Sequence, residues 1–187
     1  MTQTTDAQGD TQQMNAPRKD GLRPAYFFLV AALVFIADQY SKRWIVNSMY
    51  LGDSRPIIGQ AFQLTLAHNT GGAWSLLSNG NTMFACFAGV AIIALIFAYL
   101  RVGRHDIAVG SAFALALGGA VGNLIDRVRL GYVVDFFDAR IIHWPIFNMA
   151  DSAITISIIL LVYHYLREPK STSPSNDSYQ TIANTQE

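Results

Sequence analysis

The sequence predicts an α-helical integral membrane protein, with four transmembrane helices and a small β-rich subdomain on the membrane surface. Its 187 residues are 51% hydrophobic and only 14% charged, whereas charged residues make up about 25% of an average soluble domain. Polar residues concentrate in the two ends of the chain, 1–23 and 168–187, which have little apolar surface to bury. Between these ends lie four long stretches without Asp, Glu, Lys or Arg: 24–37, 80–100, 107–125 and 152–166.

The lengths of these stretches fit membrane spans. The second and third contain 21 and 19 residues, close to the roughly 20 that cross a bilayer as a helix. The first and fourth reach that length when each includes one aspartate, Asp38 or Asp151, which gives spans 24–41 and 145–166. We therefore expect a membrane domain over 24–167, flanked by two disordered tails.

Two other interpretations of the apolar stretches fit the sequence less well. A soluble helical bundle would need a polar face on each helix, and residues 91–100 and 112–117 provide none. A cleaved signal peptide would need a small-x-small site after Ala37, where Asp38 follows instead. Four retained spans place both termini on one side of the membrane. Because the basic residues are divided almost evenly between the two sides, the positive-inside rule does not fix the orientation.

The segment between the first two spans, residues 44–79, is too long for a simple turn. Within it, residues 62–66 alternate between apolar and polar side chains, as a strand does, and residues 69–72 have the composition of a turn. Tryptophan favours the headgroup layer, and all three tryptophans fall on the side opposite the termini: Trp44, Trp74 and Trp144. We therefore expect a β-rich cradle over 44–79 that lies on that surface.

The acidic residues of the membrane domain are all aspartates, and they gather on one side. Six of the seven between Gly21 and Arg167 fall on the side opposite the termini, and only Asp106 falls on the other. Ionisable groups are costly at membrane depth, so each is a functional-site candidate. Asp38 also has a structural interpretation, because Lys42 follows at i+4 on the same helix face.

Three further aspartates lie in apolar surroundings. Asp126 shares a helix face with Asn123 and is either an ion-pair partner of Arg127 or part of a site. Asp135 follows two valines and precedes two phenylalanines, and Asp151 lies where the fourth span begins, a position that also suits a helix cap. Burial and mutual repulsion would raise the pKa of one member of an Asp135–Asp151 pair. Such a pair can activate water and protonate a leaving group, as in aspartic peptidases.

Other chemistries have little support in the sequence. The four histidines are scattered without ligand spacing, so we expect no metal site. The paired glycines do not fit a phosphate-binding loop, so we expect no nucleotide. The net charge of zero argues against nucleic-acid binding. A small proton-coupled transporter or channel also needs intramembrane acids, but would distribute them through the depth of the membrane; it stays as the alternative function.

Five motifs follow one another in the order found in a known family. They are Asp38-Gln39-Tyr40-Ser41-Lys42, Asn69-Thr70-Gly71-Gly72-Ala73-Trp74, Gly118-Gly119-Ala120-Val121-Gly122-Asn123-Leu124-Ile125-Asp126-Arg127, Val133-Val134-Asp135-Phe136 and Phe147-Asn148-Met149-Ala150-Asp151. Together, over about residues 29–166, they resemble the bacterial lipoprotein signal peptidases, or signal peptidase II. The second motif departs from the family's usual Asn-x-Gly-Ala-Ala-Phe, a change that bears on the substrate groove and spares the acids.

The resemblance implies an aspartic endopeptidase of the bacterial inner membrane, with its active site at the periplasmic face and both termini in the cytoplasm. It implies cleavage of prolipoproteins just before a cysteine that carries a diacylglyceryl group, with the acyl chains remaining in membrane lipid. Asp135 and Asp151 match the family's catalytic pair. The residues that match its supporting polar groups are Asp38, Asn69, Asn123, Asp126, Arg127 and Asn148. We expect no cofactor and a monomeric protein.

Overall fold

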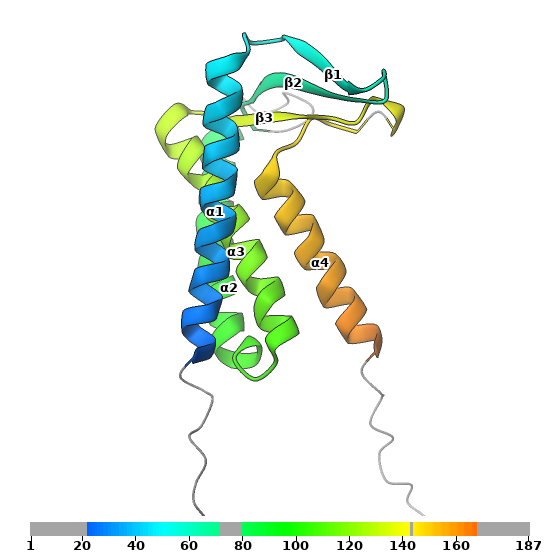
Figure 1. Ribbon diagram of the computed structural model, residues 1–187. Helices are drawn as coiled ribbons and strands as arrows, with labels where there is room; N and C mark the ends of the chain where they lie inside the picture. Colours follow the sequence, from blue (N-terminus) through cyan, green and yellow to red (C-terminus); the bar gives the residue numbers. More distant parts are fainter. Residues whose placement is uncertain (1–21, 72–79, 143, 168–187) are drawn as a thin grey trace, which may run out of the picture.

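The computed structural model describes residues 22–71, 80–142 and 144–167, which form four long helices and a small sheet (Figure 1). The helices are α1 (Leu22–Ser48), α2 (Gly80–Ala98), α3 (Ile107–Leu130) and α4 (Met149–Arg167). The strands are β1 (Ser54–Ile58), β2 (Phe62–Asn69) and β3 (Val133–Asp138). A π-helical turn, η2 (Tyr99–Gly103), continues α2, and a 3-10 turn, η3 (Arg140–Ile142), follows β3.

All four helices are long and apolar enough to cross a membrane, which confirms the predicted fold class. The start of α1 and the end of α4 lie at one end of the bundle, and the sheet lies at the other (Figure 1). Two helices extend further than expected, because α1 continues past Ser41 and α3 continues past Ile125. The charged residues that come next, Lys42 and Asp126, pair with each other inside the protein and so belong to the packed part of the bundle.

The central helix is α3, which packs against α1, α2 and α4. Small residues on α3 permit this close packing. A Cβ atom on Gly118 would lie 2.5 Å from the carbonyl oxygen of Ala31 on α1, and one on Gly119 would lie 2.5 Å from that of Ala150 on α4. These two adjacent glycines therefore let α1 and α4 approach α3 at the same level.

The sheet is antiparallel, with β2 between β1 and β3. The strand predicted over 62–66 is confirmed as β2 and continues to Asn69. The third strand comes from residues 133–138, so the cradle expected over 44–79 is incomplete without a distant segment. Since β3 is buried at almost every position, it lacks the alternation that marks a half-buried strand. An apolar cluster joins the sheet to the end of α1: Ile45, Met49, Leu66, Val134 and Phe136.

Two of the three tryptophans lie in described segments next to the sheet. Trp44, near the end of α1, and Trp144, between η3 and α4, are 56% and 60% exposed. This position agrees with the expected headgroup layer on the side opposite the termini. Trp74 lies outside the described residues, as does the end of the turn predicted over 69–72.

Candidate active site

Four aspartates lie where the sheet meets the helix bundle. Asp38 is on α1, Asp126 on α3, Asp135 on β3, and Asp151 in the first turn of α4. The last turns of α1 and α3 and the first turn of α4 reach the same end of the molecule, where β3 connects α3 to α4 (Figure 1). Four residues distant in sequence thus meet in one place, which also holds the predicted supporting residues Asn69, Asn123, Arg127 and Asn148.

Asp135 occupies the middle of β3 and is 2% exposed. Its Oδ2 accepts a hydrogen bond from Asn69 Nδ2 at 3.0 Å, and its Oδ1 accepts one from Asn148 Nδ2 at 2.7 Å. Burial raises the pKa of the Asp135 carboxyl to about 6; the charge of Asp151 also raises it, while the two amide hydrogen bonds lower it. Asp135 therefore keeps its proton at a pH where an exposed aspartate has lost it.

Asp151 caps α4, as one of its two sequence interpretations expected. Its Oδ2 accepts a hydrogen bond from the backbone N–H of Asn148 at 3.2 Å, and Asn148 Oδ1 accepts one from the backbone N–H of Asp151 at 3.0 Å. This reciprocal arrangement is a capping box, and it fixes both side chains. Asp151 Oδ1 remains for a different partner, Asn123 Nδ2, at 2.8 Å. Capping therefore does not remove Asp151 from the site.

Asn148 connects the two carboxyl groups. The residue is fully buried, and its Nδ2 also lies 3.1 Å from Asn123 Oδ1 and 3.3 Å from the carbonyl oxygen of Val134. Its side chain donates to Asp135, and its backbone N–H donates to Asp151. One asparagine thus holds a carboxyl group on a strand and another on a helix in a fixed relation.

A second charged cluster adjoins the pair and centres on Lys42, which is 3% exposed. Lys42 Nζ lies 2.8 Å from Asp38 Oδ2 and 2.9 Å from Asp126 Oδ2, and it donates to Asn123 Oδ1 at 3.0 Å. Gln39 Nε2 donates to the Asp38 and Asp126 carboxylates at 3.2 and 3.1 Å. The predicted i, i+4 pair of Asp38 and Lys42 is confirmed, within a larger network.

Asp126 pairs with Lys42 and not with Arg127, the neighbour that one sequence interpretation offered. Successive side chains on a helix point about 100° apart, so Asp126 and Arg127 face different surroundings. Arg127 Nη1 donates to the carbonyl oxygen of Asn123 at 3.3 Å, and the guanidinium carbon lies 5.6 Å from the centre of the Phe84 ring. Its Nε is buried and has no hydrogen-bond partner among the described residues. Arg127 therefore carries an unused donor.

The sequence reasoning missed two members of the network. The spacing in the sequence indicates Lys42 as a partner of Asp38 and indicates no site role for Gln39. Both lie in the first motif, where an amide and an ammonium group follow an aspartate in an otherwise apolar span. Polar groups at that depth must satisfy one another, and this requirement is the signal that identifies them.

Gly122 allows α3 to approach Asp38, because a Cβ atom on Gly122 would lie 2.5 Å from Asp38 Oδ2. We expect Gly122→Ala to displace that carboxylate and to lower the free energy of unfolding by about 1–3 kcal/mol. Thermal unfolding in detergent measures the change. Gly89→Ala on α2 is the matched control, since nothing lies within 4 Å of its added Cβ. Equal Tm values for the two variants would contradict this account of Gly122.

The chain matches a peptidase family over nearly all of its described part. Residues 30–167 match the family model Peptidase_A8, signal peptidase (SPase) II. The chain is 42% identical over 137 residues to a lipoprotein signal peptidase of Brevibacillus brevis, covering 73% of this chain and 92% of that protein. It is 38% identical over 165 residues to a lipoprotein signal peptidase of Pseudomonas putida, covering 83% and 94%.

Solved structures of a bacterial membrane enzyme, obtained by the in meso method, share the fold. One at 1.9 Å resolution superposes with a TM-score of 0.72 at 37% identity, covering 78% of this chain and 95% of that chain. Another, at 2.3 Å, gives a TM-score of 0.72 at 36% identity and covers 80% and 93%. These similarities are to peptidases and a membrane enzyme, and they give the transporter alternative no support.

Proposed function

This chain belongs to the signal peptidase II family, and on that premise we propose that Asp135 and Asp151 are its catalytic pair. The protein is a membrane aspartic peptidase that removes signal peptides from prolipoproteins. The observation that best supports this pair is their common contact with Asn148, whose side chain donates to Asp135 and whose backbone N–H donates to Asp151.

The two carboxyl groups have different roles in peptide hydrolysis, one as a hydrogen-bond donor and the other as a base. Burial raises the pKa of Asp135 to about 6, which suits it to hold the proton, and Asp151 acts as the ionised base. Asp151 takes a proton from a water molecule, whose oxygen bonds to the carbonyl carbon of the scissile peptide. Asp135 donates a hydrogen bond to the carbonyl oxygen as negative charge develops there. When the carbon–nitrogen bond breaks, the proton held by Asp151 passes to the leaving amine.

The remaining predicted residues support this chemistry. Asn69 holds Asp135, and Asn123 holds Asp151, each by one amide hydrogen bond. Arg127 lies close enough for its charge to act on both members of the pair. Its guanidinium group is partly exposed and carries donors that suit a carbonyl oxygen of an extended peptide, so we assign Arg127 to substrate binding. Its replacement by leucine should raise KM more than it lowers kcat, and the opposite pattern would contradict the assignment.

The pH dependence of cleavage follows from the pKa of Asp135. Above about pH 6 this carboxyl loses its proton, and the donor to the developing oxyanion is lost. Because kcat/KM reports ionisations of the free enzyme, we expect kcat/KM to fall as the pH rises through about 6, approaching about tenfold per pH unit. Initial rates between about pH 4 and about pH 9 measure this limb. A rate that stays constant between about pH 5 and about pH 8 would contradict Asp135 as the proton donor.

The proposal extends to the lipid part of the substrate. Helices α1, α2 and α4 expose large apolar side chains to the surroundings, and the site lies at the end of the bundle that carries Trp44 and Trp144. Acyl chains attached to a substrate cysteine can therefore stay in the bilayer while the peptide bond reaches the pair at its surface. We place this surface at the periplasmic face of the inner membrane, with both termini in the cytoplasm and a monomer as the working unit.

A cleavage assay tests the peptidase and its lipid requirement together. Purified protein in detergent is incubated with a diacylglyceryl-modified prolipoprotein or with the unmodified precursor, and cleavage is followed as a shift on a gel. We expect cleavage of the modified protein alone. Equal cleavage of both precursors would refute the lipid requirement, and cleavage of neither would refute the function. A periplasm-dependent reporter fused after Arg167 should be inactive if the termini are cytoplasmic.

A further inference from the structure

Lys42 has three partners, and one of them is not needed to neutralise its charge. The ammonium group contacts Asp38 and Asp126 at 2.8 and 2.9 Å. Two carboxylates compensate the burial of one cation. The third contact, at 3.0 Å, goes to a neutral amide oxygen, Asn123 Oδ1. This third contact leads from the charged cluster to the catalytic pair.

The contact with Lys42 fixes the orientation of the Asn123 amide. Asn123 Oδ1 accepts from Lys42 and from Asn148 Nδ2, at 3.0 and 3.1 Å, and Asn123 Nδ2 donates to Asp151 Oδ1 at 2.8 Å. If the amide flipped, its NH2 group would face two donors and its oxygen would face a carboxylate. Two donors on the oxygen also polarise the amide and strengthen the donor that faces Asp151.

The two carboxylates that flank Lys42, those of Asp38 and Asp126, accept hydrogen bonds from the backbone next to Asp151 and Asp135. Asp38 Oδ1 accepts from the backbone N–H of Ala150 at 3.0 Å, and Ala150 immediately precedes Asp151. Asp126 Oδ2 accepts from the backbone N–H of Val134 at 3.2 Å, and Val134 immediately precedes Asp135. Each neighbour of Lys42 thus anchors the residue before one catalytic aspartate.

We propose that Lys42 is a positioning residue of the catalytic pair: it orients Asp151 through Asn123 and anchors the backbone of both aspartates through Asp38 and Asp126. This inference rests on the proposed function of the pair. Lys42 touches neither Asp135 nor Asp151 directly. Its effect on these two residues is transmitted by the Asn123 amide, by the two backbone contacts and by its charge.

The charge of Lys42 adds an effect that a purely structural role does not have. The groups that bear charge around the pair are Asp38 and Lys42 on α1, Asp126 and Arg127 on α3, Asp135 on β3 and Asp151 on α4. Lys42 favours the ionised form of Asp135 and so lowers its pKa, against burial and the charge of Asp151. Removal of Lys42 should therefore raise the pKa of Asp135. The fall of kcat/KM with rising pH, the alkaline limb of the pH profile, should then move to higher pH.

Two variants separate positioning from neutralisation. We expect Lys42→Met to lower kcat by about 10- to 100-fold, the effect of a small displacement of a catalytic group, and also to lower Tm, because two carboxylates lose their cation. The double variant Lys42→Met/Asp126→Asn removes one negative charge with the positive one. It should regain most of the Tm while kcat stays low and the alkaline limb stays shifted. Arg43→Met, on an exposed neighbour in α1, is the control and should change neither.

The proposal is overturned if the double variant regains the wild-type kcat together with the wild-type pH profile. A second measurement needs no substrate: a carbon-13 NMR titration of labelled aspartates should show a higher Asp135 pKa in Lys42→Met than in the wild type, and an unchanged value also overturns the proposal. Failure of the wild type to cleave would refute the proposed function instead, so the two failures are distinguishable.

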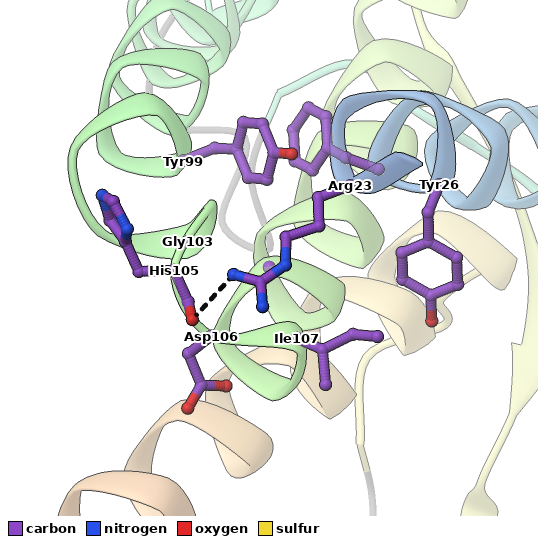
Figure 2. A pocket seen from close by; sticks show the side chains of 9 residues that line it. Arg23, Tyr26, Tyr99, Gly103, His105, Asp106 and Ile107 are labelled. Carbon is purple, nitrogen blue, oxygen red and sulfur yellow. Dashed lines mark hydrogen bonds between the residues drawn. The ribbon is translucent and has the colours of Figure 1, made fainter. Parts of the chain in front are cut away.

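A cavity lies at the end of the bundle opposite the sheet, and Figure 2 shows the side chains that line it. It has a volume of about 620 Å³ and lies between the start of α1, η2 and the start of α3. Gly110, which lines it, precedes Asn123 by 13 residues on α3, a separation of about 20 Å along the helix. The cavity is therefore distinct from the aspartate site.

The cavity combines an apolar wall with a basic rim. Phe27 and Tyr99 stack with ring centres 3.7 Å apart, and the buried Tyr99 hydroxyl has no hydrogen-bond partner within the described ranges. Arg23 Nη1 donates to the carbonyl oxygens of Arg104 and His105 at 2.8 and 3.0 Å, and Figure 2 shows the second of these bonds. The other nitrogens of Arg23 are left as free donors among the described residues. The one carboxylate on the rim, Asp106, is engaged as the cap of α3.

The geometry points to an anionic phospholipid as the occupant, with its phosphate on Arg23 and part of an acyl chain against Phe27 and Tyr99. Basic pockets between transmembrane helices bind acidic lipid headgroups in this way. Arg101 and Arg104 in the adjoining segment add positive charge, so the rim carries a surplus over Asp106.

Thermal unfolding in detergent tests this site with phosphatidylglycerol and phosphatidylcholine of identical acyl chains. Phosphatidylglycerol should raise the wild-type Tm more than phosphatidylcholine does, since a ligand stabilises the state that binds it. Arg23→Gln and the cavity-filling Ile107→Trp should abolish the difference. Arg55→Gln is the control, because it also loses a contact to a backbone carbonyl but lies at the sheet. This variant should keep the difference between the two lipids. Equal effects of the two lipids, a preference that survives Arg23→Gln, or an equal Tm rise with inorganic phosphate alone overturns the proposal.

Discussion

Replacement of Asp135 by asparagine is expected to slow prolipoprotein cleavage by about 10³- to 10⁴-fold. Asparagine nearly reproduces the shape of the side chain, but it has no acidic proton to hold or exchange. Asp151→Asn removes the base and should cause a loss of similar size. Initial rates of the gel-shift reaction with the diacylglyceryl-modified precursor measure both losses.

Asp135→Asn should also alter how the stability of the protein depends on pH. The carboxyl pKa of Asp135 is about 6 in the folded protein, against an ordinary value of 3.8 that applies when the chain is unfolded. Between these two values the folded state keeps a proton that the unfolded state has lost. The wild type therefore loses stability as the pH rises through this window and loses no more above it. Asp135→Asn lacks this contribution, so its Tm should vary less over the same window.

Asp138→Asn is the matched control for this prediction. Asp138 lies on the same strand and undergoes the same chemical change, but its carboxylate binds Thr65 Oγ1 at 2.8 Å and Arg140 Nε at 2.9 Å. Neither contact involves Asp135 or Asp151, so Asp138→Asn should retain cleavage. If Asp135→Asn cleaved at the wild-type rate, or if Asp138→Asn lost as much activity, the assignment of Asp135 would be wrong.

The sequence predicted the membrane spans well because their signal is local. Residues 80–100 contain no charged group over a bilayer-spanning length, and no tertiary contact is needed to recognise them. The clustering of the aspartates was also predictable, because four spans of alternating direction bring their ends together. Asp38, Asp126, Asp135 and Asp151 were placed on one side by this topology alone, and the structure has them there.

The pairings within the cluster were beyond the sequence because they depend on side-chain direction and on a distant strand. Lys42 and Asp126 are adjacent only because α1 packs on α3, and one helix position decides that Asp126, not Arg127, faces the lysine. β3 gave no alternating pattern, since it is buried on both sides. The amide orientations of Asn123 and Asn148 are likewise set by their partners and not by residue type.

The replacement of Asn148 by aspartate is expected both to destabilise the folded protein and to slow cleavage. Asn148 Nδ2 faces three acceptors, at 2.7 Å on Asp135, 3.1 Å on Asn123 and 3.3 Å on Val134. Asn148→Asp puts an oxygen where that NH2 group lies, so a donor among acceptors becomes a buried, unpaired negative charge. We expect the free energy of unfolding to fall by about 3–5 kcal/mol at neutral pH and cleavage to fall by more than about 100-fold.

The sign of the pH effect separates charge from shape in this variant. Burial and the neighbouring oxygens raise the pKa of the introduced carboxyl above its value in the unfolded chain. Its destabilisation therefore grows as the pH rises, and the Tm deficit relative to the wild type should be smaller at about pH 5 than at about pH 8. Asn47→Asp makes the same change on an exposed position of α1 and should leave Tm and cleavage nearly unchanged. A Tm deficit for Asn148→Asp that did not depend on pH would mean that lost hydrogen bonds, and not the new charge, disrupt the contact that joins Asp135 to Asp151.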